Sequence, residues 1–236
     1  MCESKTVLEK FVAEGAVIKI DENIYRIPFV SQPISCDVIF ITCSDCTWIF
    51  DVGLNKTSLN VISAIPGKKK VVISHFHPDH TINLAFFKSD ELYVSKNTKH
   101  YTMKGSVISE KTDFECFLDD GQKVNLSVQP FPSCHAKGCL CMIFGNYAFM
   151  GDGTYCKERL GKHIYDANTM AEEIAALEEL PCEYVCLDHD PNFVQKRSDL
   201  IELHKKIYSR RDKYKSYICV DDFFADDGSV KRDYTI

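Results

Sequence analysis

The chain has 236 residues, of which 45% are hydrophobic and 26% are charged, and these fractions are ordinary for a soluble globular protein. Its formal net charge of −6 argues against general affinity for nucleic acid, which requires a basic face. No apolar run approaches the length of a bilayer span, and the N-terminal residues lack the pattern of a secretory signal. We therefore expect a cytoplasmic protein without nucleic-acid or membrane partners.

In the first part of the chain, short apolar runs separated by turn residues predict antiparallel strands. These runs are residues 17–20, 24–27, 38–42 and 47–50. A short helix is expected over 56–64, followed by a buried strand over 71–74 and a second helix over 79–88.

A second group of strands follows, with Gly145-Asn146 as a tight hairpin turn. Its strands are expected at residues 91–94, 123–129, 139–144 and 146–150. Helices over 168–180 and 196–210 flank a short strand at 184–187. Two sheets packed face to face, with helices outside, would bury both groups of strands.

The twelve cysteines are scattered through apparent strands and helices of a chain too large to need disulfides, so we expect reduced thiols. Cys43-Ser44-Asp45-Cys46 is a single CxxC between two strand-like segments, with no second pair at zinc-finger spacing. We interpret it as a hairpin turn in preference to a metal knuckle or a redox pair.

The run His75-Phe76-His77-Pro78-Asp79-His80 directly follows the buried strand at 71–74. A strand alternates its side chains between two faces, but a turn at its end can gather them, and Pro78 with Asp79 supplies turn chemistry. Three imidazoles and a carboxylate gathered in this way are the ligand set of a transition-metal site, most often zinc.

Three further candidate ligands lie where predicted strands begin or end. His135 lies in a loop before a strand, Asp152 follows a strand that runs into glycines, and His189 follows the strand at 184–187. Two metal ions about 3.5–4 Å apart need a shared carboxylate and enough nitrogen ligands for both. These positions could complete such a site.

With these motifs the chain resembles the metallo-β-lactamase-fold superfamily of metallohydrolases over nearly its whole length. The first signature of the family, an apolar strand ending in Asp-x-Gly, is present as Ile49-Phe50-Asp51-Val52-Gly53. Its HxHxDH signature and its three later ligands correspond to His75, His77, Asp79, His80, His135, Asp152 and His189.

The resemblance implies an α+β fold, a four-layer αββα sandwich, as a single domain over residues 1–236 with a peripheral C-terminal tail from about 215 to 236. It implies two Zn²⁺ ions per chain, with Fe or Mn as possible substitutes. It assigns one metal to His75, His77 and His135, the other to Asp79, His80 and His189, and the bridge to Asp152. Asp51 would orient the site, as supporting residues of metal ligands do.

The chain departs from the family pattern at three points. Thr81-Ile82-Asn83 replaces the glycine pair that often follows HxHxDH, so the start of the local helix can differ. True β-lactamases of this fold commonly place a cysteine where Asp152 stands, so antibiotic hydrolysis is not expected. Diiron oxidoreductases of the fold usually carry glutamate where this chain has His77, which argues against that activity.

The implied function is hydrolysis of an ester, lactone, thioester or related bond in a small-molecule substrate. Zinc lowers the pKa of a bound water to about 7 and so provides hydroxide at neutral pH. Asp79 could shuttle a proton to the leaving group. Two alternatives stay open, a mononuclear-iron sulfur dioxygenase of the same fold and a non-catalytic metal-binding module.

Tyr155 stands three residues after Asp152, which resembles the arrangement in acyl-homoserine-lactone lactonases, where the phenol assists at the carbonyl. A tyrosine packed near the site is the equally weighted alternative. Of the remaining histidines, we expect His204 on a solvated helix face and His100 on the surface, while His163 is a weaker candidate for the pocket lining.

Overall fold

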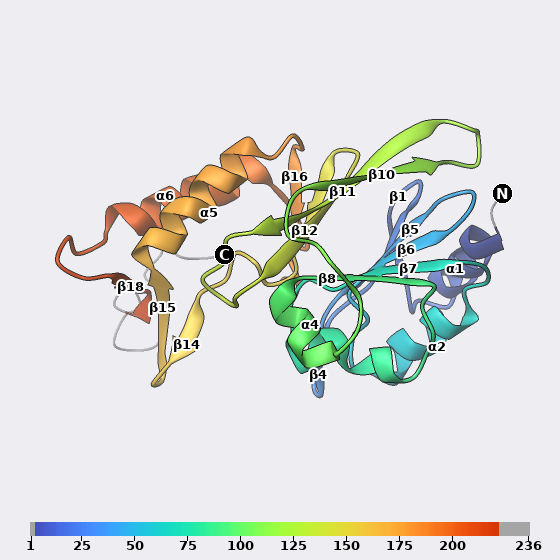
Figure 1. The fold of residues 1–236 in the computed structure, drawn as a ribbon, viewed down its shortest axis with the longest axis horizontal. Helices are drawn as coiled ribbons and strands as arrows, with labels where there is room; N and C mark the ends of the chain where they lie inside the picture. The colour runs from blue at the N-terminus through green and yellow to red at the C-terminus, as the bar shows by residue number, and fades with distance from the viewer. Residues whose placement is uncertain (1–2, 222–236) are drawn as a thin grey trace.

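The computed structural model describes residues 3–221, and its largest element is a mixed sheet of seven strands (Figure 1). In order across the sheet these are β1 (Ile18–Asp21), β2 (Ile24–Ile27), β5 (Val38–Thr42), β6 (Thr47–Phe50), β7 (Lys69–Val72), β8 (Glu91–Val94) and β9 (Ser106–Val107). The strands are antiparallel from β1 to β6 and parallel from β6 to β9. The parallel part therefore sends the carboxyl ends of its strands to one edge.

A second sheet of six strands faces the first. Its order is β10 (Thr112–Phe117), β11 (Lys123–Phe131), β12 (Cys139–Phe144), β13 (Tyr147–Phe149), β16 (Tyr184–Cys186) and β17 (Val194–Lys196). All neighbours are antiparallel except β13 and β16, which are parallel. The predicted turn at Gly145-Asn146 joins β12 to β13, where Gly145 has a φ of +57° that favours glycine.

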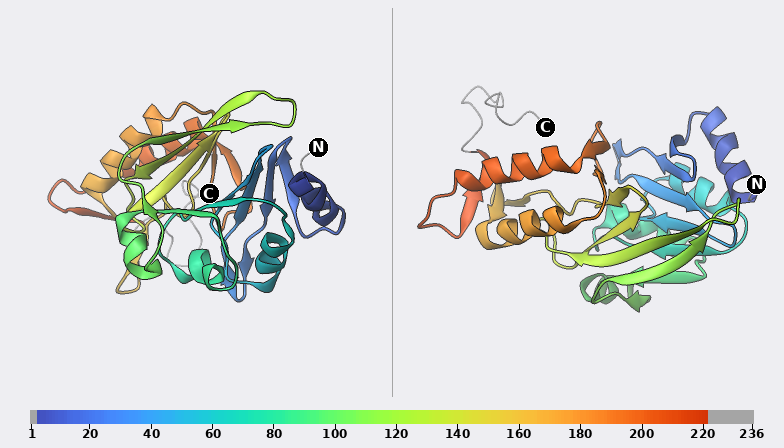
Figure 2. Two further views of the ribbon diagram at one scale, coloured as in Figure 1. Left: turned by 45° about the vertical axis from the view of Figure 1, so that its right-hand side comes forward. Right: turned by 90° about the horizontal axis from the view of Figure 1, so that it is seen from above.

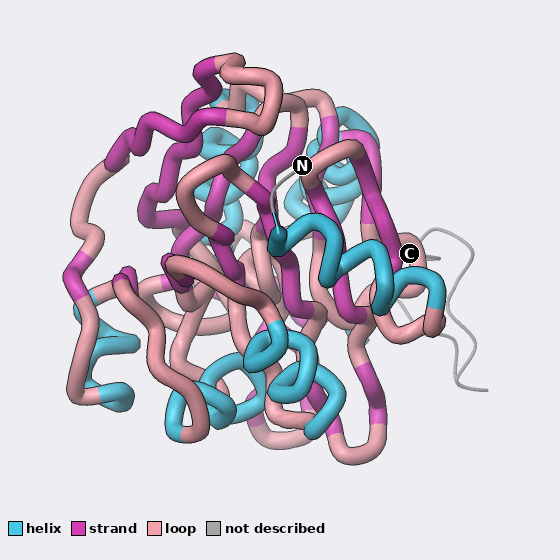
Figure 3. The backbone as a smooth tube through the Cα atoms, turned by 90° about the vertical axis from the view of Figure 1, so that its right-hand side faces the viewer, coloured by secondary structure: helices cyan, strands magenta, loops and turns pink. Residues whose placement is uncertain are grey.

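Helices cover the outer face of each sheet (Figures 2 and 3). On the first sheet, Leu8 of α1 (Glu3–Ala13) and Ile62 of α2 (Lys56–Ala64) pack with Phe40 and Ile49. On the second sheet, α5 (Ala167–Glu179) and α6 (Arg197–Ser209) lie side by side, and their apolar residues pack with those of β12 and β16. The predicted four-layer αββα sandwich is confirmed.

The inner core lies between the two sheets. Trp48 and Phe50 of β6 pack with Leu126 of β11 and Phe149 of β13, and all four side chains are fully or almost fully buried. This is the continuous apolar layer that two facing sheets must share. Among residues 3–221, no helix has the length and apolar character that crossing a bilayer requires.

Two small sheets complete the strands. One consists of β14 (Lys157–Arg159), β15 (Lys162–Asp166) and β18 (Tyr217–Cys219), and the other of β3 (Val30–Ser31) and β4 (Ile34–Ser35). Because β18 pairs with β15 and buries Ile218, this part of the tail predicted to be peripheral belongs to a sheet. The rest of that tail, residues 222–236, lies outside the described residues.

The predicted helix over 79–88 is wrong in length. The chain forms α3 (Pro78–Thr81), one 3₁₀ turn η1 (Ile82–Ala85) and then leaves the helical path, and the next helix is α4 (Lys96–Thr102). Asn83 is buried, and its side-chain amide donates hydrogen bonds of 3.0 Å to the carbonyls of Val52 and Asn55. These bonds fasten the turn to the loop after β6, which holds HxHxDH against that loop.

The CxxC segment is the hairpin turn that the sequence predicts. Thr42 pairs with Thr47, and the Cys43 amide donates to the Cys46 carbonyl at 2.9 Å. The cysteines among residues 3–221 are free thiols.

Candidate metal centre

The seven predicted ligands meet at the edge where strands of both sheets end. His75 follows β7, Asp152 follows β13 and His189 follows β16, each by three residues. Because β6 with β7 and β13 with β16 are parallel pairs, their carboxyl ends point the same way within each sheet. The loop between β11 and β12 adds His135 to the same edge. The fold therefore brings seven side chains that are separate in the sequence into one cluster.

The first group of ligand atoms comes from His75, His77, His135 and Asp152. His77 Nδ1 lies 2.8 Å from His75 Nε2 and 3.1 Å from His135 Nε2. Asp152 Oδ2 lies 3.3 Å from His135 Nε2. Three imidazole nitrogens and one carboxylate oxygen thus converge at spacings suited to the coordination sphere of one metal ion.

The second group comes from Asp79, His80, His189 and again Asp152. Asp79 Oδ2 lies 3.1 Å from His189 Nε2 and 3.4 Å from His80 Nε2. Asp152 Oδ1 lies 3.6 Å from His189 Nε2. Asp152 Oδ2 also lies 3.5 Å from His80 Nε2, so this carboxylate contacts both groups and is placed to bridge two ions.

Hydrogen bonds within the cluster do not satisfy all of its ligand atoms, which is expected where the ligands bind metal ions. Within residues 3–221, His80 Nε2 and Asp152 Oδ1 are buried polar atoms without a hydrogen-bond partner, a state that is rare unless something else satisfies them. Burial and the neighbouring His80 hold the pKa of His75 well below its usual range, so its imidazole is neutral, as a metal ligand must be. Imidazole nitrogens with carboxylate oxygens are ligands that zinc accepts in proteins.

No protein-family model and no curated protein matches the sequence of the chain. Comparison of structures does find matches. The Rm3 metallo-β-lactamase superposes with a TM-score of 0.62 at 15% identity, over 83% of this chain and 93% of the lactamase. The chain has the metallo-β-lactamase fold.

Two other structures with this fold carry iron in their descriptions. The chemotaxis sensor ODP, described with a peroxy diiron species, matches with a TM-score of 0.58 at 15% identity, over 80% of this chain and 93% of ODP. A flavo-diiron protein variant from Thermotoga maritima matches at 0.61 and 12% identity, over 84% of this chain and 62% of that protein. Identities this low establish the shared fold alone.

Asp51 and Ser74 orient two of the histidines of this metallo-β-lactamase fold. Asp51 is fully buried; it accepts the Ser74 amide at 2.7 Å through Oδ1 and lies 2.8 Å from His80 Nδ1 through Oδ2. Ser74 Oγ lies 3.0 Å from His75 Nδ1. A proton held on Nδ1 of each ring leaves Nε2 free to face the ligand cluster. This geometry matches the orienting role predicted for Asp51.

The close approach of Ser74 to the backbone of Gly151 requires glycine at this position. This glycine has a φ of +55°, and a Cβ there would lie 2.7 Å from both Cβ and Oγ of Ser74. Any other residue would displace the serine that contacts His75, so the glycine before Asp152 serves the packing of the site.

Asp37 supports the last histidine, and nothing in the sequence pointed to it. Its carboxylate is fully buried, accepts the His189 amide at 3.1 Å and the Phe29 amide at 3.2 Å, and lies 3.4 Å from Arg26 Nη1. Burial raises the pKa of Asp37 to about 6. His189 has a φ of +62°, so this bond stabilises a backbone conformation that few residues adopt.

Glu173 and His204 stand behind the loops that carry His135 and Asp152. Glu173 Oε1 accepts the Cys134 amide at 2.5 Å, and burial raises the pKa of this carboxyl to about 8. His204 Nε2 lies 3.2 Å from the Thr154 carbonyl and 3.9 Å from Glu173 Oε2. The prediction of a solvated His204 is wrong, because the residue is 2% exposed and belongs to the buried stripe of α6.

Tyr155 is partly buried beside the second helical layer, and its hydroxyl donates to the Asp188 carbonyl at 2.6 Å. A phenol has one proton to give, and here it fixes the residue before His189. Burial raises the pKa of Tyr155, so the proton stays in place. The arrangement favours a positioning role over the predicted catalytic one.

The other histidines lie away from the cluster. His163 is on β15, where its exposed ring lies 2.8 Å from Asp221 through Nδ1, so it is a surface residue and not part of a pocket lining with the ligands. His100 is exposed on α4, as predicted.

Proposed function

We propose that the chain is a metal-dependent hydrolase that cleaves an ester, lactone, thioester or related bond in a small-molecule substrate. The observation that carries this proposal is the pair of ligand groups that share Asp152. Two zinc ions held by these residues would supply a water of pKa about 7 and would polarise the oxygen of the bond under attack. The activity then depends on what the surrounding side chains do.

Asp79 is the side chain best placed to move a proton. Burial alone would raise its pKa, but His189, whose Nε2 lies 3.1 Å away, and the neighbouring His80 hold the pKa well below the usual range. The carboxylate is therefore ionised at neutral pH, and 13% of the side chain is exposed at the site. An ionised carboxylate there can accept a proton from the attacking water and pass it to the leaving group.

The remaining residues hold this arrangement in place. Asp51 and Ser74 keep the histidine protons on the side away from the cluster, and Asp37 holds the backbone of His189. Asp152 is ionised as a bridge requires, because the neighbouring His80 holds its pKa low despite its burial. Such contacts keep the metal ligands in position, and loss of a residue that supports a ligand typically weakens metal affinity about 10–100-fold.

A redox protein is the second candidate function, which the diiron descriptions of two structural neighbours support. The His77 position argues against it, because the diiron members of the family usually carry glutamate there. His77 Nδ1 instead joins two other imidazole nitrogens at 2.8 and 3.1 Å. Iron as the metal retained on purification, with no hydrolysis of any substrate class, would favour the redox candidate.

The test is hydrolysis of a panel of esters, lactones, thioesters and phosphodiesters by the zinc-loaded protein. We expect turnover on at least one class, reduced about a hundredfold or more in Asp79→Asn. Asp113→Asn, an exposed aspartate on β10, is the matched control and should retain full turnover. Absence of turnover on every class, or equal rates in the wild type and Asp79→Asn, would overturn the proposal.

A further inference from the structure

Three cysteines meet at the end of the molecule opposite the metal centre. Cys43 and Cys46 close the β5–β6 hairpin, and Cys116 lies on β10 of the other sheet. Cys46 precedes Asp51 by five residues along β6, which corresponds to about 16 Å of extended strand. The three thiols form part of the inner core and are 0%, 5% and 1% exposed in that order.

Hydrogen bonds hold the three cysteines together. The Cys43 amide donates to the Cys46 carbonyl at 2.9 Å, which places these residues opposite each other across the hairpin. The Ser44 amide donates to the Phe117 carbonyl at 2.7 Å, which fastens the turn to β10 next to Cys116. Hairpin pairs have Cα separations of about 4.5–5.5 Å, within the range that a disulfide spans.

Cys43 lies in the same core cluster as Cys116 and Cys46. The thiols of Cys116 and Cys46, together with burial, raise the pKa of Cys43. The neighbouring Cys43 thiol lowers the pKa of Cys116 against the opposing effect of burial, with smaller contributions from Trp48 and Lys70. A lowered pKa favours the thiolate, which is the form that attacks a disulfide.

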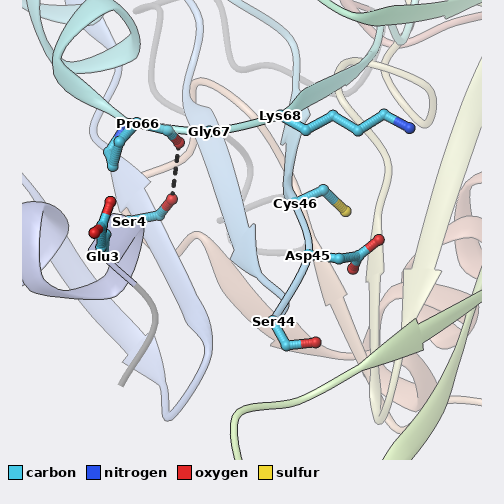
Figure 4. Close-up of a pocket in the computed structure, with 8 residues that line it drawn as sticks. All are labelled: Glu3, Ser4, Ser44, Asp45, Cys46, Pro66, Gly67 and Lys68. Atoms are coloured by element: carbon cyan, nitrogen blue, oxygen red, sulfur yellow. Dashed lines mark hydrogen bonds between the residues drawn. The ribbon is translucent and has the colours of Figure 1, made fainter.

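Cys46 is the member that reaches solvent. It lines a pocket of about 200 Å³ between the start of α1 and the hairpin, with Ser44, Asp45 and Lys68 (Figure 4). Figure 4 shows the Cys46 side chain between those of Asp45 and Lys68. A small oxidant in this pocket would meet Cys46 before it met either of the other two thiols.

We propose that these thiols form a redox relay in which a hydroperoxide oxidises Cys46 and the oxidation ends as a disulfide between Cys43 and Cys116. The Cys46 thiol gives up its proton and its sulfur attacks a peroxide oxygen, the O–O bond breaks, and sulfenic acid forms as the leaving oxygen takes that proton and departs as water or an alcohol. The Cys43 thiol attacks that sulfur, and the hydroxyl leaves with the Cys43 proton as water.

Disulfide exchange completes the relay. Cys116 attacks the Cys43 sulfur, and Cys46 departs as a thiol with the proton that Cys116 gives up. In sum, two thiols lose two protons and two electrons to the hydroperoxide, which becomes water and an alcohol or a second water. The product covalently joins the two sheets across the inner core. An external dithiol that enters at Cys46 reverses the sequence.

Peptide mapping tests the relay on the zinc-loaded wild-type chain. The protein is treated with hydrogen peroxide, alkylated and cleaved before aspartates, which places each cysteine in its own peptide, 37–44, 45–50 and 113–118. We expect peptide 37–44 to be linked to 113–118, and a dithiol to remove the link. All three peptides alkylated as in untreated protein, or links mainly to other cysteines, would overturn the proposal.

Three variants separate the steps. Cys116→Ser should trap the link between 37–44 and 45–50, whereas Cys46→Ser should slow formation of the 37–44 to 113–118 link at least tenfold. Cys141→Ser, a fully buried cysteine of β12 outside the trio, should change neither result. An unchanged rate in Cys46→Ser would overturn the relay even if a Cys116→Ser variant fails to fold.

Discussion

Replacing Asp51 by asparagine should weaken one of the two metal sites while leaving the backbone intact. Asp51 accepts the Ser74 amide at 2.7 Å and lies 2.8 Å from His80 Nδ1. An amide has one acceptor oxygen, and the Ser74 N–H retains it. The new NH₂ group then faces His80, which must accept at Nδ1 and carry its proton on Nε2, the atom turned toward Asp79 and Asp152.

The expected effect follows from that change of tautomer. A protonated Nε2 cannot bind a metal, and loss of an orienting partner of this kind typically weakens metal binding about 10–100-fold. That range corresponds to about 1.4 to 2.7 kcal/mol. The φ of +57° at Asp51 adds no complication, because asparagine tolerates the left-handed region as well as aspartate does.

Competition with a chromophoric zinc chelator measures both sites in one titration. In Asp51→Asn the site of His80 should weaken by the stated range, and the site of His75, His77 and His135 should stay within about threefold of the wild type. Asp113→Asn is the exposed control and should match the wild type at both sites. Two unchanged dissociation constants in Asp51→Asn would refute the assignment of His80 and its tautomer.

Three further predictions concern stability and turnover. Tyr155→Phe leaves the Asp188 carbonyl without its donor, so it should lower the free energy of unfolding by about 0.5–1.5 kcal/mol in a denaturant titration. A hundredfold loss of turnover at unchanged stability would instead support the catalytic role of Tyr155. Chelation of the bound metal should lower the melting temperature, and added zinc should restore it. Zinc at a thousand times its dissociation constant stabilises the folded protein by about 4 kcal/mol. Identical melting curves with and without chelator would count against an integral metal site. Glu173 has a folded pKa of about 8 against an ordinary value of 4.5, so the unfolded chain binds fewer protons between these values and the free energy of unfolding falls as pH rises through that window. Its slope contribution reaches about 1.4 kcal/mol per pH unit, and Glu173→Gln should flatten the profile; parallel profiles would contradict the assignment.

The ligand cluster was predictable because its signals are local. HxHxDH places four donors in six residues at the end of a strand, and the later candidates each follow or precede a strand. The supporting residues were not predictable in this way. Asp37 holds an amide 152 positions away and Glu173 one 39 positions away, and no local pattern connects such pairs. Only packing of the two halves brings them together.

His204 shows a signal that the prediction missed. It lies four residues after Leu200 and three before Ile207, so it falls on the buried stripe of α6 and not on a solvated face. A histidine within an apolar stripe predicts a buried, hydrogen-bonded ring. The same residue is consequently unsuitable as an inert control for site variants.

The fold was predictable where strands and helices have strong apolar patterns, as at 38–42, 47–50 and 139–144. Two of the missed elements, β14 and α4, lack that pattern. β14 is Lys-Glu-Arg, and α4 buries only Thr98 and depends on Ser95, whose side chain accepts the Thr98 amide as an N-cap. The helix after HxHxDH was overextended because Asn83 makes tertiary bonds that helical periodicity does not reveal.

Elemental analysis of the purified chain, prepared without added metal or chelator, tests the central claim of a dinuclear site most directly. The shared position of Asp152 predicts two metal equivalents per wild-type chain and no more than one in Asp152→Asn. His100→Ala, an exposed histidine on α4, should keep both equivalents. Trace metal in the wild type, or two equivalents in Asp152→Asn, would contradict the account.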